Sequence, residues 1–157
     1  MSLDPPQGGK WSSDGLRLGI VCARYNEVLT DALMDKVTTI IKDAGEPERL
    51  IMERVPGSHE VPVAMSLMLE AESFDCLVGL GVVIKGSTSH HHLVAESAGQ
   101  AMQQLAVEGS TPIINGIIVT DSIEDAEARV TGSLDRGLEF GEAALHMAEL
   151  KRKWTKN

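Results

Sequence analysis

The chain has 157 residues, 43% of them hydrophobic, which is enough for one domain with a buried core. Only 3% are aromatic, so that core must consist mainly of Val, Ile, Leu, Met and Ala. The formal net charge of −9 argues against nucleic acid as the main partner, because a protein that neutralises phosphates needs a basic face.

Residues 1–15 are rich in Pro, Gly and Ser and show no periodicity, which predicts a flexible N-terminal arm before a single α/β domain over residues 16–157. Trp11 in this arm is either a stray surface side chain or an anchor on a neighbouring subunit. The sequence has neither an apolar run of about 18 residues nor a basic leader before an apolar stretch. We therefore expect a cytoplasmic protein without a membrane partner.

Strand and helix patterns alternate four times along the rest of the chain, which predicts a parallel sheet between two layers of helices. Pro62 fits only the first turn of its helix, and Ser122 caps another helix with Asp125 three residues later. Asn26 is expected to cap the first helix, which Gly45 ends. Strands are predicted over residues 16–22, 50–55, 76–84 and 112–119, and helices over residues 26–45, 59–73, 88–109, 122–130 and 138–154.

Both cysteines, Cys22 and Cys76, fall in predicted strands. Two buried free thiols are the favoured interpretation, with a disulfide as the alternative.

In such a sheet the carboxyl ends of all strands meet at one edge, which is the default place for a site. Polar residues follow each predicted strand there: residues 24–26 (RYN), 56–60 (PGSHE), 85–90 (KGSTSH) and 120–122 (TDS). Gly86, Ser87 and Thr88 at a helix start are suited to an anion, because free amides, hydroxyls and the positive end of the helix dipole coincide. Lys85 precedes Gly86, the reverse of the order that a nucleotide-binding P-loop requires, so an NTPase is rejected.

Three adjacent histidines, His90, His91 and His92, raise the question of a metal site. Successive helical residues point about 100° apart, so we do not expect them to converge on one ion. A histidine in the first helical turn beside a bound anion is placed for proton transfer. His90 is therefore the catalytic candidate, and a solvated helix start is the alternative.

Other polar residues at this edge have both structural and functional interpretations. Tyr25 is either a core residue or an aromatic that stacks on a planar ring. Glu60 either stabilises its helix N-terminus or accepts hydrogen bonds from polyol hydroxyls. Arg129 and Arg136 are either solvated or phosphate clamps.

Four motifs in order carry a family resemblance: residues 23–27 (ARYNE), 55–62 (VPGSHEVP), 81–90 (GVVIKGSTSH) and 116–121 (GIIVTD). Together they resemble the successive signatures of lumazine synthase. The resemblance implies condensation of 5-amino-6-(D-ribitylamino)uracil with 3,4-dihydroxy-2-butanone 4-phosphate to 6,7-dimethyl-8-ribityllumazine, a step of riboflavin biosynthesis. It also implies a flavodoxin-like three-layer α/β/α sandwich with a central four-stranded parallel sheet, and neither a metal nor an organic cofactor.

The same resemblance implies a homo-oligomer, either a pentamer or a capsid of pentamers, with each active site between adjacent subunits. Riboflavin synthase is a further candidate partner. The implied roles are proton transfer by His90, phosphate binding by Gly86, Ser87, Thr88 and Arg129, and binding of the pyrimidine and its ribityl chain by Tyr25, Asn26, Ser58, His59, Glu60, Val83, Ile84, Asn115 and Arg136. Asn115, Arg129 and Arg136 are expected to come from the neighbouring subunit.

This chain departs from the family pattern at three places. His59 replaces an aromatic or bulky apolar residue, and His91 with His92 replaces an aromatic–acid pair. The segment over residues 130–138 differs most, so the choice between Arg129 and Arg136 as the phosphate clamp stays open. The alternative function is a non-catalytic flavin- or lumazine-binding or shell protein on the same scaffold. A flavodoxin-type electron carrier is disfavoured because one Tyr and two Phe supply few aromatics to enclose a flavin.

Overall fold

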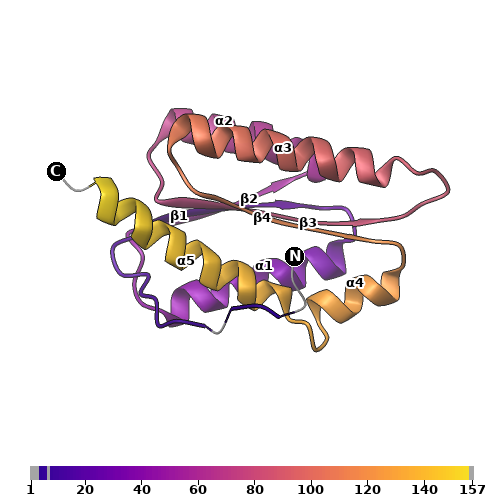
Figure 1. Ribbon diagram of the computed structural model, residues 1–157, viewed down its shortest axis with the longest axis horizontal. Helices are drawn as coiled ribbons and strands as arrows, with labels where there is room; N and C mark the ends of the chain where they lie inside the picture. Colours follow the sequence, from indigo (N-terminus) through magenta and orange to yellow (C-terminus); the bar gives the residue numbers. More distant parts are fainter. Residues whose placement is uncertain (1–3, 7, 156–157) are drawn as a thin grey trace.

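The computed structural model describes residues 4–6 and 8–155. Its centre is a parallel sheet of four strands, in the order β2-β1-β3-β4, with helices on both faces (Figure 1). The strands are β1 (Arg17–Ala23), β2 (Arg49–Val55), β3 (Cys76–Ile84) and β4 (Ile113–Thr120). The predicted flavodoxin-like α/β fold is confirmed.

Helices α2 (Val61–Ala71) and α3 (His91–Gly109) cover one face of the sheet, and α1 (Glu27–Asp43), α4 (Ile123–Val130) and α5 (Arg136–Thr155) lie on the other (Figure 1). A two-residue period along β1 divides its side chains between two buried cores. Leu18, Ile20 and Cys22 join the core beneath α1 and α5, whereas Val21 and Ala23 join the core beneath α2 and α3. The central strand β1 is therefore buried on both faces, as expected within a parallel sheet.

The two middle strands end at different heights along the sheet. Ala23 at the end of β1 pairs with Val55 of β2, while Cys22 pairs with Leu80 of β3. Strand β3 therefore continues roughly 10 Å past β1, at about 3.3 Å per residue. All four carboxyl ends lie at one margin of the sheet, which we call the carboxyl edge.

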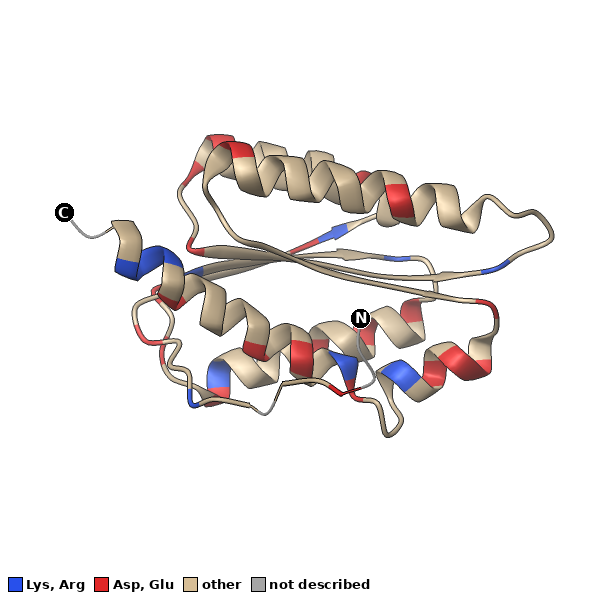
Figure 2. Cartoon of the chain, viewed as in Figure 1, with Lys and Arg blue, Asp and Glu red and all other residues tan. Residues whose placement is uncertain are grey.

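The two strands that extend furthest at this edge, β3 and β4, are uncharged. Strands β3 and β4 contain no charged residue and appear uniformly tan in Figure 2. Each strand is followed directly by a charged residue, Lys85 after β3 and Asp121 after β4. Both cysteines are buried free thiols, as predicted.

Several predicted helix starts are confirmed. A short 3₁₀ turn (Ser58–Glu60) leads into α2, and Pro62 lies in the first turn of that helix. The Ser122 hydroxyl accepts the Asp125 amide at 3.1 Å and caps α4. The predicted start of α3 at residue 88 was wrong, since the helix begins at His91 and residues 87–90 form a bend and turn.

The described part of the segment expected to be an arm packs on its own chain. The Trp11 ring stacks on His146 of α5, with ring centroids 4.2 Å apart and an interplanar angle of 9°. Ser13 is buried, and its hydroxyl donates to the Ile41 carbonyl of α1 at 2.7 Å. Residues 1–3 and 7 of this segment lie outside the described residues.

Candidate active site

The turn after β1 is fixed by Asn26. Its backbone is left-handed (φ 60°), a conformation that Asn tolerates better than most residues. Asn26 occupies the N-cap position of α1 as predicted, but its side-chain Nδ2 donates across the sheet to the Val82 carbonyl at 2.8 Å. This bond joins the turn to the part of β3 that extends beyond β1.

Tyr25 stands beside this turn and is 73% exposed, so it belongs to the surface rather than to the core. Gly57, in the loop after β2, lies against the Tyr25 ring, where an added β-carbon would come within 3.3 Å of Cδ2. The aromatic ring is therefore held at the carboxyl edge by two neighbouring loops, with most of its surface free.

The loop after β2 is ordered by its own carboxylate. The Gly57 amide donates to Glu60 Oε2 at 2.9 Å, so Glu60 does act at the helix start. Ser58 is buried and packs directly over Gly81 of β3, where a larger residue would collide with the serine hydroxyl. His59 is exposed.

The loop after β3 carries the remaining predicted groups. Val83 and Ile84 are half-buried at the strand end, and residues 85–90 are exposed. Thr88 Oγ1 and His90 Nδ1 form a hydrogen bond, and His90 is the N-cap of α3. Because α3 starts at His91, Gly86 to Thr88 form a loop ahead of the helix rather than its first turn.

The three residues expected from a neighbouring subunit lie on β4, α4 and α5, outside the loops after β1, β2 and β3. Asn115 pairs with Gly79, five residues before the final pair of Ile84 and Thr120, so it lies roughly 16 Å back along β4 at about 3.3 Å per residue. Arg129 donates to the Asp125 carbonyl within α4 at 2.9 Å. Arg136 donates to Glu139 within α5 at 2.7 Å.

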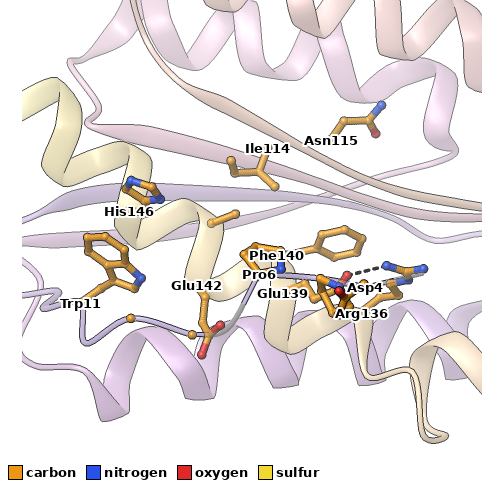
Figure 3. Close-up of a pocket in the computed structure, with 14 residues that line it drawn as sticks. Asp4, Pro6, Trp11, Ile114, Asn115, Arg136, Glu139, Phe140, Glu142 and His146 are labelled. Carbon is orange, nitrogen blue, oxygen red and sulfur yellow. Dashed lines mark hydrogen bonds and ion pairs between the residues drawn. The ribbon is translucent and has the colours of Figure 1, made fainter. Parts of the chain in front are cut away.

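A pocket of about 500 Å³ lies between the N-terminal segment, β4 and α5 (Figure 3). Trp11 and His146 lie at one end of it and the Arg136–Glu139 pair at the other. Asn115 also lines it. Two of the residues predicted to come from a neighbour thus share one hollow, away from the carboxyl edge.

The model of the family described as 6,7-dimethyl-8-ribityllumazine synthase matches residues 15–152, nearly the whole chain. The chain belongs to the 6,7-dimethyl-8-ribityllumazine synthase family. A 6,7-dimethyl-8-ribityllumazine synthase from Aquifex aeolicus (strain VF5) is 35% identical over 144 residues, which cover 90% of this chain and 94% of the relative. One from Burkholderia mallei (strain SAVP1) is 36% identical over 138 residues, covering 87% of this chain and 78% of the relative.

The predicted lumazine synthase, an enzyme of riboflavin biosynthesis, is therefore confirmed. The matched region contains all four sequence motifs and the loops of the carboxyl edge. Within the described residues, the structure of this lumazine synthase family member has no helix long and apolar enough to cross a bilayer.

One cluster beside the carboxyl edge, formed by His91, His92 and Asp121, lies outside the roles that the lumazine synthase motifs imply. The rings of His91 and His92 lie 3.9 Å apart, although consecutive helical residues were expected to diverge. Asp121 approaches them from the end of β4, with Oδ1 3.6 Å from His91 Nε2. Because β3 and β4 are neighbours in the sheet, the residues that follow these two strands could be expected to lie close together.

Proposed function

We propose that the carboxyl edge is the active site, and that it condenses 5-amino-6-(D-ribitylamino)uracil with 3,4-dihydroxy-2-butanone 4-phosphate to 6,7-dimethyl-8-ribityllumazine. The observation that carries this proposal is the convergence of an exposed aromatic, a carboxylate and a histidine on the loops after β1, β2 and β3. Each is held by a contact to a neighbouring residue: Tyr25 by Gly57, Glu60 by the Gly57 amide, and His90 by Thr88.

The pyrimidine stacks on Tyr25, whose exposed face offers a planar apolar surface. Ser58, His59 and Glu60 lie in the adjoining loop, near the ribityl chain. Glu60 uses Oε2 for the Gly57 amide, which leaves Oε1 to accept a ribityl hydroxyl. The backbone of Val83 and Ile84 faces the ring, and Asn26 holds the strand end in place through Val82.

The phosphate lies on the loop formed by Gly86, Ser87 and Thr88. Amides and hydroxyls on an exposed loop stabilise the charge of the anion as it departs. An arginine from a second chain completes the cradle, and Arg129 is the first candidate. Arg129 Nη1 donates to a backbone carbonyl of α4, and the other N–H groups of the guanidinium are available to a phosphate.

His90 transfers protons. The pyrimidine amine attacks the ketone carbon to form a carbinolamine, whose hydroxyl leaves as water after protonation. Removal of a proton from carbon then expels the phosphate and leaves an enol, which takes up a proton at its terminal carbon to become a methyl ketone. The second amine attacks this ketone and closes the ring with loss of another water. The bond to Thr88 fixes Nδ1, so Nε2 faces the reactants and alternates between donating and accepting. Holding both reactants side by side supplies a large share of the acceleration.

A second copy of the chain completes the site. Asn115 lies too far back along β4 to reach the carboxyl edge of its own sheet. Large apolar side chains are exposed on several elements, as expected for surfaces covered in an assembly. They include Val28, Val63, Leu67, Leu93 and Ile123. The assembly is a homo-pentamer or a capsid of pentamers, with Asn115, Arg129 and Arg136 facing the neighbour's carboxyl edge.

Activity is tested by mixing the purified protein with both substrates and following lumazine absorbance. We expect product well above the spontaneous rate, and a rate equal to that background would refute the proposal. His90→Ala should lower kcat about 100- to 10,000-fold with little change in pyrimidine affinity, as expected for lost acid–base catalysis. Lys42→Ala, at an exposed residue in the last turn of α1 and so at the opposite end of the sheet, is the control and should retain the normal kcat.

A further inference from the structure

His91 is a buried side chain with unsatisfied polar atoms. It is 3% exposed, and among residues 4–6 and 8–155 neither ring nitrogen has a hydrogen-bond partner. Buried polar groups in native proteins nearly always have a partner, so an orphaned imidazole indicates that a group outside the protein satisfies it. Imidazole nitrogens are hydrogen-bonding groups and also common metal ligands.

Two further donors lie within reach of His91. His91, His92 and Asp121 each offer one atom that could bind a metal ion, and these three atoms lie within 4.8 Å of one another. His91 Nε2 and Asp121 Oδ1 are 3.6 Å apart, which is too far for a hydrogen bond. Two ligands that are each about 2.1 Å from a tetrahedral ion are about 3.4 Å apart, close to this separation.

The three donors belong to rigid elements that are held together. His91 and His92 are the first two residues of α3, and Asp121 directly follows β4. The Lys85 amide donates to the Thr120 carbonyl at 3.0 Å, which fixes the end of β4 beside the loop that leads into α3. The His92 and Asp121 side chains are exposed, so small rotations are enough to bring their donors to one ion.

The geometry points to a binding site for a divalent transition-metal ion, Zn²⁺ foremost, on His91, His92 and Asp121. Two imidazoles and one carboxylate suit Zn²⁺ and its neighbours in the first row, whereas Mg²⁺ and Ca²⁺ prefer oxygen ligands. The three protein ligands leave at least one position for water. The ion joins the start of α3 to the turn after β4, one residue from His90, and thereby restricts the loop over residues 85–90.

This inference does not rest on the proposed reaction, and its test is a binding measurement. The tag-free full-length chain, stripped with a chelator, is titrated with Zn²⁺ by calorimetry in a buffer that does not coordinate metals. We expect saturation at one ion per chain and no competition from a large excess of Mg²⁺. Co²⁺ in the same site should give a visible absorption spectrum with histidine-ligand character that Zn²⁺ displaces.

Two exposed ligands provide variants that should fold normally. His92→Ala and Asp121→Asn should each weaken Zn²⁺ binding at least about 100-fold, since even loss of an outer-shell partner often costs 10- to 100-fold. His146→Ala is the matched control and should bind as the parent does. Absence of saturable Zn²⁺ binding, or binding that is unchanged in Asp121→Asn, would overturn the site.

Discussion

Asn26 makes two separable contributions to the carboxyl edge, and two substitutions distinguish them. One is its left-handed backbone (φ 60°), and the other is the hydrogen bond from Nδ2 to the Val82 carbonyl at 2.8 Å. Asn26→Gly removes the hydrogen bond but adopts a left-handed backbone freely. Asn26→Ala removes the same bond and adds a β-carbon that disfavours this conformation.

The expected losses follow from these two terms. A hydrogen bond of this kind contributes about 1 kcal/mol net. A left-handed backbone costs Ala about 1 kcal/mol more than Asn, so Asn26→Ala should lower the free energy of unfolding by about 2 kcal/mol. For Asn26→Gly we expect about 1 to 1.5 kcal/mol, because the glycine gains roughly 0.5 kcal/mol of freedom in the unfolded chain.

The measurement is urea unfolding followed by far-UV circular dichroism, at one protein concentration for all variants because association affects stability. The Ala variant should be the less stable by about 0.5 to 1 kcal/mol. Both variants should also raise KM for the pyrimidine, because Tyr25 precedes this turn. Equal stability of the two variants would refute the conformational argument, and stability equal to that of the parent would refute both arguments.

Three further predictions concern other contacts. Thr88→Val should lower kcat about 3- to 10-fold, because His90 loses its orienting bond, whereas Thr88→Ser should retain the parent kcat; an unchanged kcat in the Val variant would contradict this role. Burial raises the pKa of Cys22 from 9.0 to about 11. The folded state then holds this proton more tightly than the unfolded state, so the free energy of unfolding should fall as pH rises from 9.0 to about 11. The fall should be less steep in Cys22→Ala. An equally steep fall in the variant and the parent would contradict a raised Cys22 pKa. Asp75 accepts two hydrogen bonds from Arg152 at 2.8 Å and one from the Arg17 amide at 2.7 Å. Asp75→Asn should therefore lower the free energy of unfolding, measured by urea unfolding, by about 2 kcal/mol. A loss below about 0.5 kcal/mol would be inconsistent with this network.

The order of elements could be predicted because their signals are local. The apolar run of β3, Pro62 in the first turn of α2, and the Ser122 cap each depend on residues within one element. The start of α3 was placed three residues early because Thr88 and Ser89 are acceptable helix-start residues. The structure uses Thr88 to hold His90 instead.

Long-range contacts explain what the sequence could not supply. Asn26 was expected to cap its helix by a local rule, but its acceptor is 56 residues away in β3. The glycine- and serine-rich segment before β1 gave no sign that Ser13 would be buried or that Trp11 would stack on His146. Asp121 met His91 only through the pairing of β3 with β4.

The central claim is that each active site combines the carboxyl edge of one chain with residues of a second copy. It is tested by mixing two variants with strongly reduced activity, His90→Ala and the double variant Arg129→Ala/Arg136→Ala, then unfolding and reassembling them together. If the site is shared, random association in equal amounts should restore lumazine synthesis to about a quarter of the parent rate, because that fraction of interfaces joins two intact halves. Activity no higher than the sum of the separate variants would show that one chain supplies the whole site.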